Sequence, residues 1–121
     1  MSDQENGSAR ILDERLRLGA GFGADDRAHV LDILSSLDRH LAHWSPERVD
    51  LAISVKDRRG PEQKVILEAW LPRWPPLVAT SAGRDLDHAL TDVRKDIIRR
   101  IEDEKTRRAP HKGGPGRERT A

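Results

Sequence analysis

The sequence predicts an α+β fold, a two-layer sandwich in which a four-stranded sheet carries two helices on one face, in the order β-α-β-β-β-α. Two segments repeat apolar residues every three or four positions, which is typical of amphipathic helices. Other segments alternate apolar and polar residues, as strands with one buried face do. A short polar turn joins the two clearest strands and predicts an antiparallel hairpin. Because only one side of these strands is apolar, both helices are expected on that side.

The chain of 121 residues is long enough for one domain with a modest core. Regular patterning begins at Arg10 and ends near Arg108, so residues 10–108 are expected to form an α+β domain. Residues 1–9 are polar and are expected to be disordered. Residues 109–121 begin Ala-Pro-His-Lys-Gly-Gly-Pro-Gly, which cannot continue a helix, and are expected to form a flexible basic tail.

The first strand and the first helix are predicted between residues 15 and 44. The strand is expected where Leu16, Leu18, Ala20 and Phe22 alternate with Arg15, Arg17, Gly19 and Gly21. The helix follows, with Asp25 or Asp26 as its N-cap, because a carboxylate there can accept hydrogen bonds from first-turn N–H groups. It should end before Ser45-Pro46, since the residue before a proline disfavours the helical conformation. Its apolar stripe consists of Val30, Ile33, Leu34, Leu37, Leu41 and Trp44.

Three strands and a second helix make up the rest of the predicted domain. Residues 49–56 alternate cleanly, whereas residues 64–71 carry an apolar side and also Ile66 and Trp70 on the other side. The two segments flank the polar turn 57–61 and are expected to pair as a hairpin. Prolines then interrupt the pattern, and residues 77–82 resume it as a shorter strand that is expected at an edge or after a turn. Asp85 is the expected N-cap of the last helix. The buried stripe of that helix is predicted to be Leu86, Ala89, Leu90, Val93, Ile97 and Ile101.

Positive charge is concentrated at the C-terminal end. Residues 105–121 hold six Lys and Arg against one acid, a charge of +5, whereas the total is only +1 and residues 10–104 carry about −2. Such an end suits a phosphate-rich partner, and it equally suits a solubilising segment with no partner. The chain has no cysteine, no basic start followed by an apolar run, and no apolar stretch of membrane-spanning length. We therefore expect a cytoplasmic protein without disulfides or membrane contact.

The residue pattern of the last helix resembles that of a known protein family. It reads Asp85-Leu86 and Ala89-Leu90 and then enters a run rich in Lys and Arg, after the strand and helix order given above. From about Arg10 to Lys112 this resembles the ribosome hibernation-promoting factors, also called the protein Y or sigma-54 modulation family. The resemblance implies a short-form, monomeric, cytoplasmic protein that binds rRNA of the small ribosomal subunit in the channel of messenger and transfer RNA, and inhibits translation under stress. It implies RNA contacts by Arg94, Lys95, Arg99, Arg100, Lys105, Arg107 and Arg108.

Further cations extend this set, while nearby acids argue against it. Arg15 and Arg17 on the first strand, Arg58 and Arg59 in the turn, and Lys112 beyond the helix are further candidates for phosphate contact. If about six of these groups neutralised phosphates, affinity would fall roughly a thousandfold between low and physiological salt. Two departures from the family are Asp87, where a tyrosine is common, and the acidic run Glu102-Asp103-Glu104. The opposing interpretation is a self-neutralised helix face, with the pairs Asp92–Lys95, Asp96 with Arg99 or Arg100, and Asp103–Arg107.

Three tryptophans and one glycine-rich run are candidates for other sites. Trp74 stands beside Arg73 and Pro75-Pro76, where it can either stack on an unpaired base or pack against its loop, and packing is favoured for Trp74 and more strongly for Trp44 and Trp70. The run Gly19-Ala20-Gly21-Phe22-Gly23-Ala24 matches a dinucleotide-binding pattern. Asp25-Asp26 would repel a pyrophosphate at that helix start, and the strands that follow are expected to pair as a hairpin rather than as parallel crossovers.

Catalysis finds little support in the sequence. His40 and His43 lie three residues apart but have no companion ligands at a metal-binding spacing, and no nucleophile motif occurs. We therefore expect no enzyme activity, no metal and no cofactor. Three hypotheses remain: a ribosome-binding translation inhibitor, a protein-interaction module of the same fold that has lost ribosome binding, and a nucleotide binder or enzyme that depends on the glycine run alone.

Overall fold

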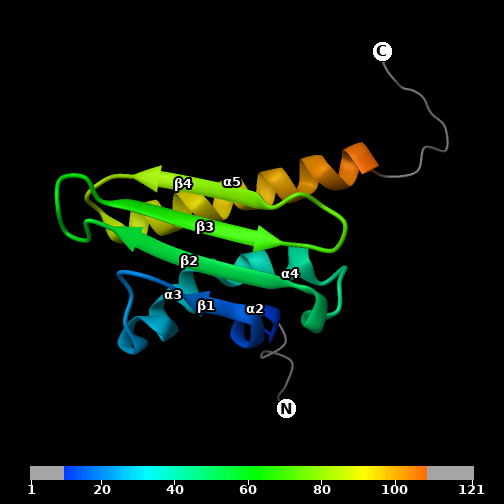
Figure 1. Cartoon of the computed structure of the whole chain (residues 1–121), viewed down its shortest axis with the longest axis horizontal. Coiled ribbons are helices and arrows are strands. Elements are labelled where there is room, and N and C mark those ends of the chain that lie inside the picture. Colours follow the sequence, from blue (N-terminus) through cyan, green and yellow to red (C-terminus); the bar gives the residue numbers. More distant parts are fainter. Residues whose placement is uncertain (1–9, 109–121) are drawn as a thin grey trace.

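The computed structural model describes residues 10–108. The predictions of a disordered N-terminus at 1–9 and a basic tail at 109–121, including Lys112, lie outside these residues. A four-stranded sheet in the order β1-β2-β3-β4 stands in front of the helices in Figure 1, with α3, α4 and α5 behind it. The predicted α+β sandwich, with its helices on one face of the sheet, is confirmed. Within the described residues, no helix is long and apolar enough to cross a membrane.

The sheet is mixed, because its first strand runs parallel to the second. β1 (Leu16–Leu18) pairs in parallel with β2 (Asp50–Lys56), and the remaining pairs, β2 with β3 (Lys64–Trp70) and β3 with β4 (Leu77–Ala82), are antiparallel. The predicted hairpin and the edge position of β4 are therefore confirmed. Alternate residues of β2 and β3 are buried against the helices, as the period-2 pattern requires.

The N-terminal prediction was wrong in one respect, since the structure adds a short helix, α2 (Arg10–Arg15), before a strand of only three residues. Ile11 and Leu12 are buried, and the Leu12 N–H donates to the carboxylate of the buried Asp38 at 3.0 Å. The chain beyond β1 still follows β2 for a short distance, because Val55 N–H donates to the Ala20 carbonyl at 2.9 Å. Gly21 then turns away at φ 90°, where a Cβ would lie 2.2 Å from the Val55 oxygen, so only glycine fits.

The first predicted helix is divided into three pieces. After a single 3₁₀ turn at Ala24–Asp26, α3 (Arg27–Leu34) is followed by a 3₁₀ turn at Ser35–Leu37 and by α4 (Asp38–Leu41). The backbone tightens at two consecutive serines, which are weak helix formers. The apolar stripe nevertheless continues through the break, because four of its six members are buried: Val30, Leu34, Leu37 and Leu41. Ile33 and Trp44 are half-buried.

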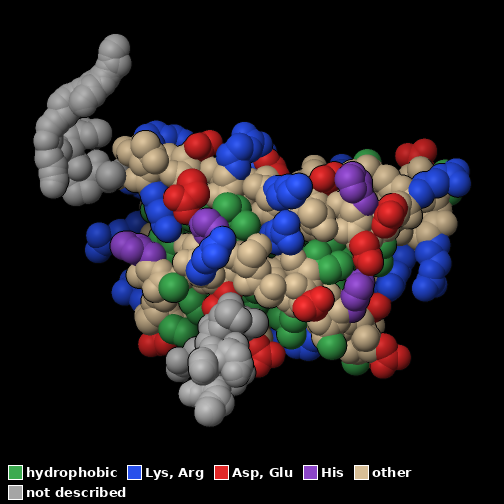
Figure 2. Space-filling view, turned by 180° about the vertical axis from the view of Figure 1, so that it is seen from behind, with side chains coloured by type: hydrophobic (Ala, Val, Ile, Leu, Met, Phe, Trp, Pro, Cys, Tyr) green, Lys and Arg blue, Asp and Glu red, His purple; other side chains and the backbone are tan. Residues whose placement is uncertain are grey.

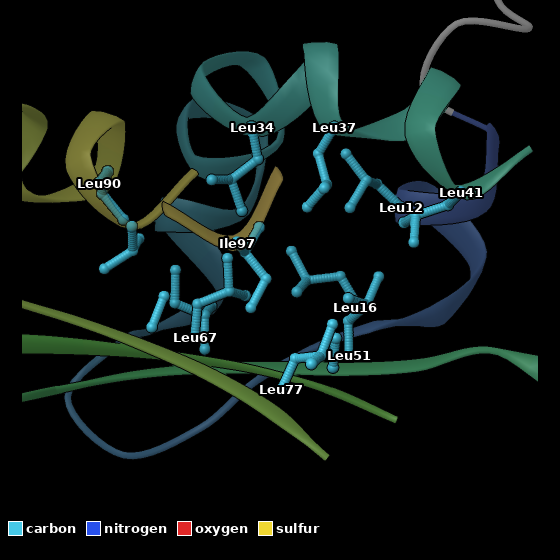
Figure 3. Close-up of a cluster of buried hydrophobic side chains, with 14 of the residues drawn as sticks. Leu12, Leu16, Leu34, Leu37, Leu41, Leu51, Leu67, Leu77, Leu90 and Ile97 are labelled. Atoms are coloured by element: carbon cyan, nitrogen blue, oxygen red, sulfur yellow. The ribbon is translucent and has the colours of Figure 1, made fainter. Parts of the chain in front are cut away.

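Helix α5 (Leu86–Arg108) closes the core against β3 and β4. Its predicted N-cap is confirmed, since the His88 N–H donates to the Asp85 carboxylate at 3.1 Å. The predicted stripe is buried from Ala89 to Ile101, while Leu86 at its start is only half-buried. Figure 3 shows how leucines of α2, α3 and α4 meet those of the sheet and of α5 in a single core. With the helix side packed in this way, the opposite face of the sheet remains open (Figure 1).

Candidate nucleic-acid interface

The cations of the second half of α5 are largely paired with carboxylates of the same helix. Arg99 contacts Asp96, and the Arg100 Nε donates to the other oxygen of Asp96 at 2.9 Å. Burial would raise the pKa of Asp96, but the hydrogen bonds from Arg100 and Arg99 outweigh it and hold that pKa below its usual value. The predicted pairs of Asp96 are therefore confirmed.

At the end of α5, Glu104 pairs with two arginines and so offsets one of their two charges. Its side chain is only 7% exposed and accepts from Arg107 at 2.8 Å and from Arg108 at 2.6 Å. The predicted partner of Arg107 was Asp103, so that assignment was wrong by one residue. Lys105 lies 3.6 Å from Glu102, whose pKa is lowered mainly by a 2.8 Å hydrogen bond from His40 and further by Lys105.

Figure 2 shows the resulting surface on the helix side, where Lys and Arg side chains are interleaved with Asp and Glu. The predicted Asp92–Lys95 pair is absent: Asp92 accepts from Ser81 at 3.1 Å and lies 3.5 Å from His88. A shallow groove of about 190 Å³ opens beside Leu77, and its arginines, Arg99, Arg100 and Arg107, are those already held by Asp96 and Glu104. The helix face therefore offers exposed guanidinium groups that are already paired with acids.

Three further candidates serve the fold. Arg15 donates to the Val49 carbonyl at 2.9 Å and to Asp50 at 3.1 Å, which ties the end of α2 to the start of β2. Arg94 donates to the Ile33 carbonyl at 2.9 Å and so joins α5 to α3. Arg58 donates to both oxygens of Asp26, at 2.8 and 2.9 Å, across the β1–α3 loop. These guanidinium groups are therefore partly buried and already bonded within the fold, and their contact with RNA stays a prediction.

Besides Arg94, which bonds to a carbonyl, the predicted residues within 10–108 that have no carboxylate partner are Arg17, Arg59 and Lys95. Arg59 and Lys95 are exposed, and Arg17 is exposed on β1 with its guanidinium 5.9 Å from the centre of the Trp70 ring. Sequence reasoning missed further cations of this kind, Lys56, Lys64 and Arg84, which are also exposed and without an acidic partner among residues 10–108. The signal that could have found Lys56 and Lys64 was the hairpin itself, because they close its two strands in directly opposite positions.

The tryptophans fall into two environments. Trp44 and Trp74 contact each other edge to face at 5.1 Å and pack against the core, with Lys105 over one ring and Arg108 over the other. The packing interpretation is thus supported for both. Trp70 differs from the prediction, because it lies on the open face of the sheet, half-buried, with Arg17 over its ring.

The glycine run opens a parallel crossover, since β1 and β2 are parallel and are joined through α3 and α4, whereas the later strands β2 and β3 form the expected hairpin. Its anion position is nevertheless occupied by the chain's own carboxylate: Gly23 N–H donates to Asp26 at 2.8 Å. Hydrogen bonds from Arg58 and then from Gly23 hold the pKa of Asp26 far below its usual range. A phosphate at this loop would have to displace that carboxylate, which argues against a dinucleotide site.

The two histidines predicted on the first helix, His40 and His43, contact different partners. His40 bonds to Glu102 of α5, and the ring of His43 lies edge to face against Trp44 at 5.1 Å. Within residues 10–108, no three His, Cys, Asp or Glu side chains are grouped so that they could hold a metal ion.

Comparison with known proteins finds similarity in structure only. No family model and no curated protein matches the sequence. Among solved structures, a ribosomal subunit interface protein from Coxiella burnetii superposes with a TM-score of 0.53 at 12% identity, covering 76% of this chain and 98% of that chain. The N-terminal domain of Protein Y from Thermus thermophilus superposes with a TM-score of 0.51 at 17% identity, covering 74% and 94%. The resemblance predicted from the sequence is therefore confirmed at the level of the fold.

Proposed function

We propose that this protein is a ribosome-associated translation inhibitor, which binds rRNA of the small subunit at the messenger and transfer RNA channel under stress. One observation carries the proposal: the chain has the fold of a ribosomal subunit interface protein and of a Protein Y domain over nearly the whole of each. Since fold alone does not define function, the proposal also needs a surface that suits phosphate. Exposed cations without acidic partners, such as Arg17, Arg59 and Lys95, supply one.

The same proposal covers the remaining properties expected from the sequence. The protein would act as a monomer on single ribosomes, in the cytoplasm, and without catalysis, metal or cofactor. The self-occupied glycine loop supports the non-catalytic part, because Asp26 and Arg58 fill the place where a nucleotide phosphate would bind.

Cosedimentation tests the proposal directly. Purified protein is mixed with 30S subunits and centrifuged through sucrose in 50 mM and in 500 mM salt. We expect comigration with the subunits in dilute buffer and its loss at high salt, because phosphate contacts release counterions. Absence from the 30S fractions in both buffers would refute ribosome binding. An added mRNA leader that competes for the channel should reduce comigration, and failure of competition would reject the channel as the site.

A second candidate is a protein-interaction module that kept the fold and lost RNA affinity. The pairing of the α5 cations with Asp96, Glu102 and Glu104 favours it. It predicts no 30S comigration at any salt concentration, together with salt-resistant capture of a protein partner. The two candidates therefore separate on the same sucrose gradient.

A further inference from the structure

We propose that the phosphate-binding surface is the open face of the sheet and its hairpin end, rather than helix α5, and that its ligand is a single strand of RNA. This deepens the proposed ribosomal function and rests on it for the source of the RNA. We call the surface the sheet-face cluster. Its members are Arg17, Lys56, Arg59, Lys64, Trp70 and Arg84.

The first observation is an uncompensated pair of like charges. Lys56 and Lys64 are directly opposite each other in the antiparallel ladder, and both are exposed. Like charges in that position destabilise a sheet, and neither ammonium group has a carboxylate partner among the described residues. The β4 residue opposite Lys64 is Ala82, which offers no compensation either. An anion between the two lysines would remove this repulsion.

The second observation is that the hairpin end is held rigidly by buried polar contacts. Gln63 is 1% exposed, accepts from Arg59 N–H at 2.7 Å, and donates to the carbonyls of Gly83 at 2.8 Å and Arg84 at 3.0 Å. This fixes the backbone of Arg59 beside that of Arg84, although they belong to different loops. Figure 2 shows Lys and Arg side chains protruding at the end of the molecule where the β2–β3 turn lies.

Most acids of this end are engaged in the chain's own hydrogen bonds, whereas the carboxylate of Glu62, in the turn, is exposed. Asp57 accepts from Glu62 N–H at 2.7 Å within the turn, and Asp85 caps α5. Asp26 is bonded by Arg58. On the open face itself, Asp50 is bonded by Arg15, which leaves Glu68 as the remaining acid of β2 and β3 on that side.

The third observation is an apolar strip between the cations that suits nucleobases. Trp70 lies half-buried with Arg17 over its ring, and the exposed Val78 and the half-buried Ile66 face the same side. Aromatic rings on an open sheet stack unpaired bases, while nearby cations hold the phosphates. The strip runs from Arg17, which pairs with Ala52 of β2, to Lys56 of the same strand. Since Ala52 and Lys56 are four residues apart, its two ends are separated by about 13 Å. That distance corresponds to about four stacked nucleotides.

Matched charge removals test the assignment in the full-length chain. Two ligands are used: a fluorescein-labelled oligouridylate of twelve nucleotides, called U12 RNA below, and 30S subunits. Binding is measured between 25 and 200 mM salt for the wild type and for the double variants Lys56→Gln/Lys64→Gln and Arg99→Gln/Arg100→Gln. Each double variant removes two positive charges. We expect the lysine variant to lose about tenfold in affinity at low salt and about two units of salt slope. The arginine variant should lose only about threefold, since Asp96 already offsets one of the two arginine charges.

A second readout does not depend on charge. RNA should quench tryptophan fluorescence in the wild type, and Trp70→Phe should abolish most of that quenching, whereas Trp74→Phe should retain it. Unfolding in urea verifies that each variant is folded, and the lysine variant is expected to be slightly more stable because a repulsion is removed.

The outcomes distinguish the surface from the function. If the arginine variant loses affinity and the lysine variant does not, the sheet-face cluster is refuted while ribosome binding stands. Wild-type binding to 30S subunits with an unchanged salt slope in both variants would point to a ribosomal protein as partner and would also refute it. Binding of U12 but not of 30S subunits would support the surface and reject the ribosomal function.

Discussion

Helix α5 and the open face of the sheet both carry several cations, yet the two surfaces present different charge to solvent. On α5, Asp96 and Glu104 each accept from two arginines of the same helix. On the sheet, Lys56 and Lys64 oppose each other without an acid. The number of cations in a segment therefore says little about the field around it, which depends on where the acids lie.

The difference follows from the geometry of the two elements. A helix brings residues three and four positions apart together, so an acidic residue in a basic run is placed beside a cation automatically. A strand points successive side chains to opposite faces and finds its neighbours across the ladder, from a different part of the sequence. Charges that alternate along the sequence are thus neutralised on a helix and can remain unneutralised on a sheet.

The largest effect on stability is expected from removing the side chain of Gln63, whose hydrogen bonds hold the two loops of the hairpin end together and are called the clamp below. Gln63→Ala would leave the Arg59 N–H and the Gly83 and Arg84 carbonyls without their buried partner. We expect the free energy of unfolding to fall by about 2–4 kcal/mol, measured by urea denaturation. Glu62→Ala, at the exposed neighbouring position, is the control and should change stability by less than about 0.5 kcal/mol. Equal losses in the two variants would contradict the clamp.

Removing an acid from α5 should make the helix face behave more like the sheet face, because each acid offsets one of the two arginine charges beside it. Glu104→Gln removes the charge that holds Arg107 and Arg108, and we expect a stability loss of about 1–2 kcal/mol and a several-fold gain in affinity for U12 RNA at low salt. Asp103→Asn makes the same change of charge one residue away and is the control. If both variants gain equally in fluorescence anisotropy titrations, net charge alone governs binding, and the pairing is irrelevant.

The sequence predicted what depends on local period. The hairpin, the stripe of α5 and the Asp96 pairs all follow from spacings of two, three or four residues, and all are present. The roles of Arg15 and Arg58 were not predictable in this way, because their acidic partners are 35 and 32 residues distant. Helix α2 was missed for the same reason, since its six residues depend on a bond from Leu12 to Asp38, 26 positions away.

Adjacent residues of α5 offer a narrower test, of a cation bonded within the fold against an exposed cation. Arg94 holds the Ile33 carbonyl, whereas Lys95 is exposed without an acidic partner in the described chain. We expect Arg94→Gln to lower the free energy of unfolding by about 1 kcal/mol and to leave RNA affinity nearly unchanged. Lys95→Gln should leave stability within about 0.5 kcal/mol of wild type and should lower the salt slope by at most about one unit. Reversed roles in the same two assays would contradict the assignment.

The smallest effect concerns pH and again separates the two faces. On the helix side, His29 of α3 lies 2.7 Å from Asp87 of α5, and the hydrogen bond with Asp87 raises the pKa of His29. A histidine whose pKa is higher in the folded state stabilises fully below its unfolded value of about 6.5, and that contribution is lost as pH rises through the folded value. Both side chains are more than half exposed, so solvent screening limits the effect to at most a few tenths of a kcal/mol.

Urea unfolding of the wild type and of Asp87→Asn at pH 6 and pH 8 checks this contribution. The difference in stability between the two proteins should be larger at pH 6, and an equal difference at both pH values would contradict the bridge. If the sheet face binds the RNA, the affinity for RNA should not depend on pH in this way. Lysine and arginine side chains do not change charge between pH 6 and pH 8, so affinity for the oligouridylate RNA should stay nearly constant over this range. A pronounced rise in affinity at pH 6 that Asp87→Asn alters would instead place the RNA on the histidine-bearing helix face.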